Sequence, residues 1–260
     1  MRIMVTGSHG TVGKALCSYL EQKGHTVVAW DRNSVSFTDY WAMENYLRSS
    51  QIKALYHLAV PSQKTGLANE SWLVNYQWTS ELAWLCKVLD VQFIFISTVM
   101  VFSSQSQGPF TVNSPADAGD GYGMEKRLAE ERVFYQNPSA KVVRLGWQIG
   151  ESPGSNNMLD FFESKMQEEG IVSCSTRWLP ACSFISDTVQ ALENVLSQGS
   201  GLYLFDTNEK WNFYQIAFAL NQIHGKRWKI TATDKFVFDQ RMQDERFPHF
   251  SLQTHLPVLK

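Results

Sequence analysis

The sequence has no long hydrophobic run, no large excess of charge and little cysteine. Its most apolar stretch, residues 91–102, is interrupted by Gln, Ser and Thr and is too short to span a bilayer. The formal net charge is -2 over 260 residues, so electrostatics give no reason to expect nucleic acid or an anionic membrane as a partner. We therefore expect neither a membrane segment nor a nucleic-acid partner.

The four cysteines, Cys17, Cys86, Cys174 and Cys182, lie in apolar or mixed segments without metal-ligand spacing. Such cysteines are typical of reduced thiols in a cytoplasmic protein. The histidines show no metal-ligand pair either, and we expect His57 to be a core residue at a strand end rather than a ligand. A glycine loop begins too early to leave room for the apolar stretch of a signal peptide. These absences predict a cytoplasmic protein without a metal site.

The composition is that of an ordinary globular protein, with 44% hydrophobic and 18% charged residues. Apolar runs alternate with longer helical patterns. We predict strands over residues 2–6, 26–30, 53–58, 91–97 and 141–145. Helices are predicted over residues 11–23, 40–48 and 70–89, after residue 122, and near 157–168, 186–197 and 212–224. This alternation predicts an α/β fold, a Rossmann-type doubly wound parallel sheet with a smaller C-terminal lobe.

Three glycines stand between the first predicted strand and the first predicted helix. Gly7, Gly10 and Gly13 allow a tight turn, a close approach of the backbone to a pyrophosphate, and close packing of the helix on the strand. The N–H groups and the positive dipole end of the helix then face the phosphate charge. This order of elements favours a dinucleotide site over a plain glycine-rich turn. Three further loop residues are placed at the cofactor: His9, Thr11 and Val12.

The end of the second predicted strand bears on the choice of cofactor. Asp31 can accept hydrogen bonds from the adenosine ribose hydroxyls, which favours NAD, and it would repel a 2′-phosphate. Arg32 could instead hold that phosphate. We expect NAD or NADP, with NAD preferred. Residues 1–150 are predicted to form the dinucleotide-binding domain, with later segments contributing, and residues 151–260 mainly the substrate-binding lobe.

A candidate for acid catalysis is the Tyr-x-x-x-Lys pair, Tyr122 and Lys126. Positions i and i+4 share a helix face, so the ammonium can lie beside the phenol and lower its pKa from about 10 toward working pH. Ser97 and Thr98 end the fourth predicted strand, at the edge where parallel sheets place ligands. A hydroxyl there can share a substrate carbonyl oxygen with Tyr122. Taken singly, the Tyr-x-x-x-Lys pair is a weak signal that also fits a surface Tyr and a solvated Lys. For Ser97 and Thr98 alone, a hydroxyl pair that merely closes a strand is the favoured interpretation.

Together these motifs resemble the extended short-chain dehydrogenase/reductases of the NAD-dependent epimerase/dehydratase superfamily. Within it the chain is most similar to the dTDP-4-dehydrorhamnose reductases. The matching segments are MRIMVTGSHGTVG at 1–13, HLAV at 57–60, VN at 74–75, STVMVF at 97–102, YGMEKRLAEE at 122–131, VVRLGWQIG at 142–150 and NN at 156–157. They cover most of the first 160 residues in order.

The resemblance implies an NAD(P)-dependent reductase acting on a keto group of a nucleotide-linked sugar or a similar polyol. It implies that Thr98, Tyr122 and Lys126 form the catalytic set, and that Lys126 also bonds the nicotinamide ribose. It places four further residues at the cofactor: Leu58, Ala59, Val60 and Ser97. It places two at the substrate: Trp147 and Asn157. Three arginines could clamp the substrate pyrophosphate or be ordinary surface residues: Arg177, Arg241 and Arg246.

Two segments depart from the rhamnose reductases. Val99 and Met100 stand where those enzymes usually carry Asp-Tyr, and STRWLPA at 175–181 replaces an Asp-Gln-x-Gly-x-Pro-Thr pattern. Because neither Val99 nor Met100 ionises, we expect no sugar dehydratase activity. Two alternatives stay open: an epimerase using the same hydride step, and a non-catalytic cofactor-binding subunit resembling the regulatory subunit of methionine adenosyltransferase. A homodimer is a further expectation.

Overall fold

The computed structural model describes residues 1–61, 66–152, 156–247 and 249–259. The chain folds into two compact units. We call the first the sheet unit; it comprises Met1–Ser103, Pro115–Arg144 and Val189–Tyr203. We call the second the C-terminal unit; it comprises Ser104–Ser114, Leu145–Thr188 and Leu204–Lys260.

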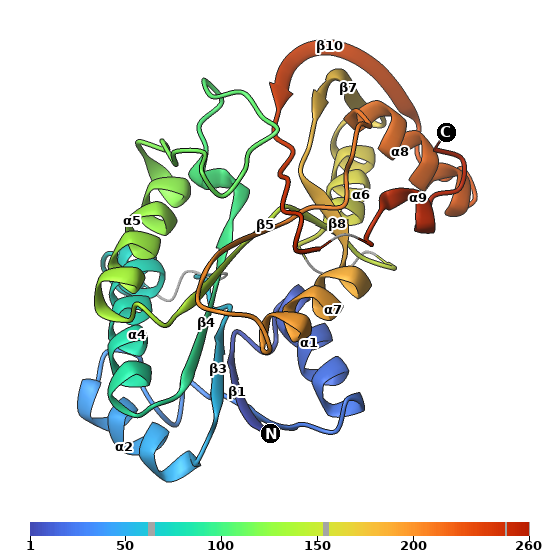
Figure 1. The fold of residues 1–260 in the computed structure, drawn as a ribbon. Helices are drawn as coiled ribbons and strands as arrows, with labels where there is room; N and C mark the ends of the chain where they lie inside the picture. Colours follow the sequence, from blue (N-terminus) through green and yellow to red (C-terminus); the bar gives the residue numbers. More distant parts are fainter. Residues whose placement is uncertain (62–65, 153–155, 248, 260) are drawn as a thin grey trace. The chain divides into compact units, whose positions relative to one another are not determined.

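The sheet unit is built on a six-stranded sheet with the strand order β2-β1-β3-β4-β5-β9 (Figure 1). The strands are β1 (Arg2–Thr6), β2 (Thr26–Ala29), β3 (Ala54–His57), β4 (Gln92–Thr98), β5 (Lys141–Leu145) and β9 (Gly201–Phe205). β1 pairs in parallel with β2 and β3, and β3 pairs in parallel with β4. The predicted Rossmann-type parallel sheet is confirmed. The strand order reverses on either side of β1, and this switch point is where open α/β sheets bind ligands.

Helices cover both faces of this sheet. Their bounds are α1 (Thr11–Gln22), α2 (Tyr40–Ser50), α3 (Glu70–Trp72), η1 (Leu73–Trp78), α4 (Thr79–Val88), η2 (Val99–Val101) and α5 (Gly121–Gln136). α2, α4 and α5 lie along one face and α1 along the other (Figure 1). Residues 93–96 of β4 are all buried, as a strand covered on both faces requires.

The predicted helix over 70–89 has the expected extent, but its middle is not α-helical. η1 is a π-helix, which holds one residue more in its turn than an α-helix. The Thr79 hydroxyl donates to the backbone oxygen of Asn75 at 2.9 Å within this stretch. Such π turns occur frequently at functional sites.

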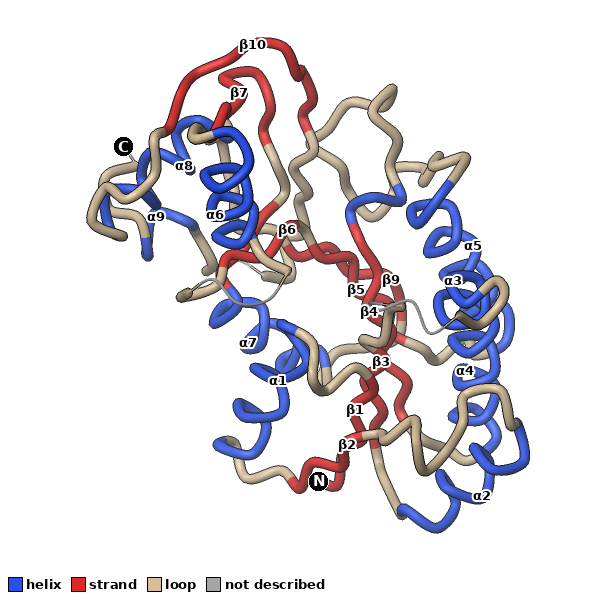
Figure 2. Tube along the Cα trace, turned by 180° about the vertical axis from the view of Figure 1, so that it is seen from behind, coloured by secondary structure: helices blue, strands red, loops and turns tan. Residues whose placement is uncertain are grey.

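The C-terminal unit contains two small parallel sheets, β6-β8 and β7-β10. Its elements are β6 (Trp147–Ile149), α6 (Met158–Glu169), β7 (Val172–Leu179), β8 (Cys182–Phe184), α8 (Phe213–Ile223), β10 (Ile230–Asp239) and α9 (Leu252–His255). α6 and α8 lie beside β7 and β10 (Figure 2). The chain returns to the sheet unit along α7 (Ile185–Val195). The helices predicted near 157–168, 186–197 and 212–224 are confirmed as α6, α7 and α8.

No helix within the described ranges is both long enough and apolar enough to cross a membrane. Across the same ranges the four cysteines are free, and Cys86, Cys174 and Cys182 are buried. Burial raises the pKa of the Cys174 thiol to about 12. That thiol therefore stays protonated at neutral pH, as a structural cysteine does.

Candidate functional site

The glycine loop between β1 and α1 has no space for a Cβ at two of its glycines, Gly7 and Gly13. Gly7 has a φ of +67°, and a Cβ on it would lie 2.8 Å from the backbone nitrogen of Ala59. A Cβ on Gly13 would lie 2.1 Å from the backbone oxygen of Gly7. α1 starts after Gly10, which offers no side-chain cap, and its first turn holds no acidic residue. An N-terminus of this kind, with backbone N–H groups and the positive end of the helix dipole, is a common place for an anion.

The backbone after β3 is tied to the end of β1. The Thr6 hydroxyl oxygen accepts hydrogen bonds from the N–H groups of Leu58 at 3.2 Å and Ala59 at 3.3 Å. The ring of His57 bonds the same hydroxyl at 2.8 Å and the Thr79 hydroxyl at 2.9 Å. Burial, with the nearby charge of Lys126, holds the pKa of His57 well below its usual value. His57 is thus a neutral core residue, as predicted, and it fixes the loop expected to contact the cofactor.

Asp31 lies just after β2, on the surface. Its carboxylate accepts from the N–H of Asn33 at 2.9 Å and from the hydroxyl of Ser34 at 2.6 Å. These bonds, the one from Ser34 most of all, lower the pKa of Asp31, so the side chain stays ionised near neutral pH. Arg32 is exposed beside it. Asp31 and Arg32 are both accessible to solvent. The hydrogen bonds from Asn33 and Ser34 hold the Asp31 carboxylate in one orientation.

The predicted catalytic residues lie where α5 meets the end of β4. A Cβ on Gly123 would lie 2.1 Å from the backbone oxygen of Met100, so the start of α5 packs directly on the segment after β4. Lys126 is 1% exposed, and its ammonium donates to the backbone oxygen of Ile96 at 2.7 Å. The Thr98 hydroxyl oxygen accepts from the N–H of Met100 at 3.2 Å. The structure therefore brings Thr98, Tyr122 and Lys126 onto two adjoining elements of one unit.

Burial dominates the proton affinities of this pair. It raises the pKa of Tyr122 to about 12, and the charge of Glu125 adds to the effect. Burial lowers the pKa of Lys126 to about 7, while Glu130 and Glu125 oppose the change. The prediction that Lys126 lowers the Tyr122 pKa is wrong, because the ammonium is directed at the Ile96 carbonyl and desolvation of the phenol is the larger effect.

Ser97 is a further candidate at this edge. It is 4% exposed, and its hydroxyl oxygen is buried without a hydrogen-bond partner among the described residues. A buried hydroxyl of this kind is costly to leave unbonded. Its position fits the expectation that Ser97 contacts a cofactor.

The predicted substrate residues lie in the C-terminal unit. Trp147 packs against Trp178, with ring centroids 5.9 Å apart, and against Phe161 and Phe213. Asn157 caps α6: its side-chain oxygen accepts from the N–H of Leu159 at 2.8 Å. The structure thus gives Asn157 a structural role, and its contact with a substrate stays a prediction.

The three arginines proposed to bind a pyrophosphate differ in their ion pairs within the protein. Arg241 is paired with Asp239, and Arg246 with Asp244, by ion pairs of 2.7 Å and 2.6 Å respectively. Arg177 is exposed on β7. To bind a pyrophosphate, Arg241 and Arg246 would have to share their guanidinium groups between the phosphate and the paired carboxylate, or give up the ion pair.

Sequence reasoning did not single out three residues: Trp178, which lies beside Trp147 in the C-terminal unit, and Glu125 and Asn75, which lie in the sheet unit. Trp178 lies inside the departing segment 175–181, and its indole nitrogen is buried without a partner among the described residues. Glu125 stands between the predicted tyrosine and lysine, and Asn75 belongs to the matching VN dipeptide. All three residues stand in segments that the sequence analysis considers. Their contacts, however, are made with residues far away in the sequence: Asn75 with Glu125, and Trp178 with Trp147 and Phe213.

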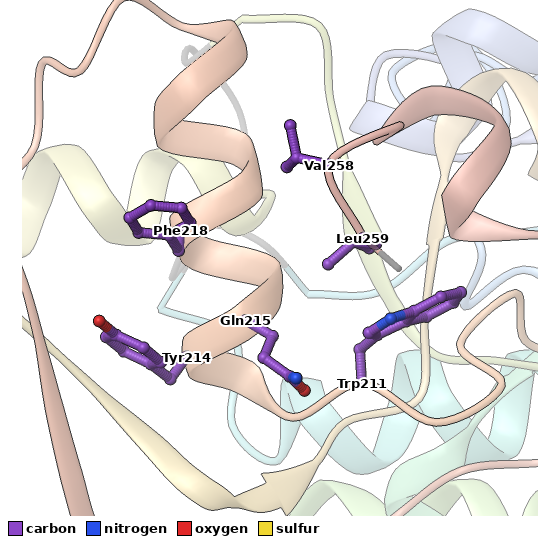
Figure 3. Close-up of a pocket in the computed structure, with 6 residues that line it drawn as sticks. All are labelled: Trp211, Tyr214, Gln215, Phe218, Val258 and Leu259. Atoms are coloured by element: carbon purple, nitrogen blue, oxygen red, sulfur yellow. The ribbon is translucent and has the colours of Figure 1, made fainter.

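A separate cavity of about 220 Å³ lies in the C-terminal unit, between α8 and the end of the chain (Figure 3). Its lining residues are Trp211, Tyr214, Gln215, Phe218, Val258 and Leu259. None of the predicted site residues lines it. The cavity is mainly aromatic and aliphatic and presents no titratable pair.

Curated relatives cover much of the chain. The spore coat polysaccharide biosynthesis protein SpsK of Bacillus subtilis (strain 168) is 25% identical over 263 residues, which span 99% of this chain and 90% of that protein. The dTDP-4-dehydrorhamnose reductase of Mycolicibacterium smegmatis is 27% identical over 206 residues, spanning 76% of this chain. The match covers 61% of the length of that reductase.

Solved structures share the fold. The dTDP-4-dehydrorhamnose reductase of Bacillus anthracis str. Ames, in complex with NADP, matches with a TM-score of 0.82 at 16% identity, covering 99% of this chain and 97% of that one. The Bordetella bronchiseptica enzyme WbmG, in complex with NAD and UDP, matches with a TM-score of 0.76 at 16% identity, covering 99% and 89%. The family model described as the RmlD substrate binding domain matches residues 1–236. This chain belongs to the RmlD substrate-binding-domain family.

Proposed function

We propose that the protein is an NAD(P)-dependent reductase of a keto group on a nucleotide-linked sugar. The observation that carries the proposal is the placement of Tyr122, Lys126 and Thr98 at the junction of α5 and β4, in the same unit as the glycine loop. Relatives within the family are named dTDP-4-dehydrorhamnose reductase and dTDP-4-keto-6-deoxy-D-glucose reductase. Those names support a keto sugar as the substrate class.

The sheet unit fits a nicotinamide dinucleotide. The backbone at Gly7 and Gly13 is too close to its neighbours to admit a Cβ, which is the shape of a cradle for a pyrophosphate. The uncapped start of α1 would face the phosphates, and Asp31 would face the adenosine ribose. When bound, the nicotinamide supplies the hydride.

Tyr122 would donate the proton to the substrate oxygen. A phenol whose pKa is about 12 is protonated throughout the neutral range, which is the form a proton donor needs. The Thr98 oxygen already accepts from Met100, so its own O–H is directed elsewhere and can donate to the same substrate oxygen. Lys126, with a pKa of about 7, supplies a positive charge that diminishes as the pH rises through neutrality.

Replacing Asp31 is expected to change the cofactor preference. Asp31→Ala should weaken NAD binding and improve the relative binding of NADP, because the carboxylate that bonds the ribose and repels a 2′-phosphate is lost. The Asp31→Asn variant removes the negative charge but keeps a side-chain oxygen that can accept from the N–H of Asn33. It therefore distinguishes the effect of the charge on cofactor binding from the effect of disturbing the turn. Arg32→Ala should reduce NADP binding selectively. Calorimetric dissociation constants for both cofactors test this. A wild-type preference for NADP above about tenfold, or 1.4 kcal/mol, would contradict the role of Asp31.

A panel of nucleotide-linked sugars tests the reaction. We expect oxidation of the reduced cofactor with a nucleotide-linked keto sugar, and no 4-keto-6-deoxy product from a nucleotide-hexose, because Val99 and Met100 carry no ionisable group. Interconversion of two sugar epimers without net cofactor consumption would indicate an epimerase. Tight cofactor binding without turnover on any sugar of the panel would favour a regulatory subunit. The homodimer and the cytoplasmic location stay predictions.

A further inference from the structure

A buried chain of hydrogen bonds runs from the end of β1 to the segment that follows the π turn. Thr6 and His57 are paired residues of the parallel strands β1 and β3, so their side chains lie on the same face of the sheet. The Thr6 hydroxyl bonds Nδ1 of the His57 ring at 2.8 Å, and Nε2 of that ring bonds the Thr79 hydroxyl at 2.9 Å. All three residues are 0% exposed, so bulk water does not compete for these bonds.

The donors and acceptors of this chain permit one arrangement of protons. The Thr6 oxygen already accepts from the N–H groups of Leu58 and Ala59, which occupy its two lone pairs. The hydrogen of the Thr6 hydroxyl is then left for Nδ1 of His57, which must accept it. Because burial holds the pKa of His57 well below its usual value, the ring is neutral and carries one N–H. That N–H is on Nε2 and donates to Thr79.

The chain ends on the π turn itself. The Thr79 hydroxyl donates to the backbone oxygen of Asn75 at 2.9 Å, and Asn75 belongs to η1. The His57 ring is also fixed by its apolar neighbours. It stacks with Phe95 at 5.9 Å between centroids and makes a T-shaped contact with Trp78 at 5.0 Å. The ring therefore joins the end of β1 to the π turn in one orientation.

The backbone held by Thr6 is expected to contact the cofactor. We call residues 58–60, which follow β3, the β3 loop. Gly7 comes directly after Thr6, and a Cβ on Gly7 would lie 2.8 Å from the backbone nitrogen of Ala59. The glycine loop and the β3 loop are therefore in close contact, and a movement of one changes its fit to the other.

We propose that His57, with its proton on Nε2, is a positioning residue that couples the π turn to the β3 loop. Thr79 accepts the Nε2 proton and thereby keeps the proton off Nδ1. A proton on Nδ1 would instead point at the Thr6 oxygen and compete there with the N–H groups of the β3 loop. The π turn thus stabilises a loop that it does not touch. The effect on cofactor binding rests on the proposed function, whereas the position of the proton does not.

The ring ¹⁵N signals of His57 test the position of the proton. At neutral pH we expect a protonated Nε2 and an unprotonated Nδ1, with both signals assigned by their loss in His57→Phe. In Thr79→Val the Nε2 proton has no acceptor, and a buried N–H without a partner is costly. Part of the population should then carry the proton on Nδ1, and Thr79→Ser should restore the wild-type signals. A proton on Nδ1, or on both nitrogens, in the wild-type protein would overturn the proposal.

Amide hydrogen exchange measures the β3 loop without a cofactor. We expect the two amide protons that bond Thr6 to exchange about tenfold faster in His57→Phe and in Thr79→Val, which corresponds to the loss of about one hydrogen bond. Thr6→Ser keeps the hydroxyl and should leave this exchange slow. Wild-type exchange rates in both His57→Phe and Thr79→Val would contradict the coupling.

Tyr56→Phe is the matched control for a general loss of stability. Tyr56 precedes His57 on β3, is 0% exposed, and its hydroxyl donates to the backbone oxygen of Leu192 at 2.7 Å. The variant removes one buried hydrogen bond from the same strand but none from the β3 loop. Thermal unfolding reports the stability of each variant, and loop exchange in Tyr56→Phe should equal that of the wild type. An equal acceleration in Tyr56→Phe would show that His57 acts through stability alone, against the proposal.

Calorimetry with NAD and NADP provides the functional measurement. We expect the dissociation constant of the preferred cofactor to rise about tenfold in His57→Phe and in Thr79→Val, and to be unchanged in Tyr56→Phe. Thr79→Ser should recover the wild-type affinity. Faster loop exchange in the variants, together with no binding of either cofactor by the wild type, would refute the proposed function alone. Faster loop exchange with unchanged dissociation constants would refute the link between the β3 loop and the cofactor.

Discussion

The Tyr122→Phe variant is expected to lose about a hundred- to ten-thousand-fold in kcat, the typical contribution of a positioned acid. The ring and its packing are retained, and only the O–H proposed to donate the proton is removed. The dissociation constant of the cofactor should change little, because the glycine loop and Asp31 are untouched. Single-turnover kinetics with a keto-sugar substrate, alongside calorimetry with the cofactor, measure both quantities.

Two comparisons sharpen this expectation. Tyr135→Phe is the matched control, since Tyr135 lies on the same helix and is 80% exposed. Lys126→Ala should impair both turnover and cofactor binding, because it removes the ammonium that lies at the end of β4. Full activity of Tyr122→Phe on the natural substrate would show that another group donates the proton.

The Gly13→Ala variant is expected to lose about a hundredfold or more in cofactor affinity, equivalent to roughly 2.7 kcal/mol or more. The new Cβ would lie 2.1 Å from the backbone oxygen of Gly7, so the loop and the start of α1 must move apart. The N–H groups proposed to face the phosphates would move with them. Overpacking of this kind also destabilises a fold, typically by about 1–3 kcal/mol.

Graded glycine variants test whether this loss comes from the loop. A Cβ on Gly10 would lie 3.3 Å from the same oxygen, so Gly10→Ala should weaken cofactor binding less than Gly13→Ala. Gly119→Ala is the neutral control, because a Cβ there meets nothing within 4 Å. Calorimetry and thermal unfolding separate affinity from stability. Wild-type affinity in Gly13→Ala would refute the assignment of the loop.

Local patterns predicted five of the six strands of the sheet unit, and β9 (Gly201–Phe205) was missed. β1 and β5 have the predicted bounds, and β4 was recognised because a strand covered on both faces needs an almost unbroken apolar run. The glycine spacing predicted a tight turn that only residues without a Cβ permit. The i, i+4 spacing placed Tyr122 and Lys126 on one helix. Each of these features is encoded by neighbours in the sequence.

The small sheets of the C-terminal unit were not predicted. β6 and β8 contain three residues each, and β10 is largely exposed, so none shows the alternation that marks a half-buried strand. β7 (Val172–Leu179) lies in a segment for which the sequence predicts no strand. These strands form because partners distant in sequence supply their hydrogen bonds.

The sequence by itself determined the fold class, and it predicted the glycine loop as the cofactor site and Thr98, Tyr122 and Lys126 as the catalytic set. Only the tertiary structure decided that the ammonium of Lys126 faces the Ile96 carbonyl, that burial raises the pKa of Tyr122, and that Glu125 is held from the π turn. Spacing along a helix fixes which side chains can meet. The depth of burial and the contacts with distant segments fix their charge, because desolvation and hydrogen bonds set the proton affinity of a side chain.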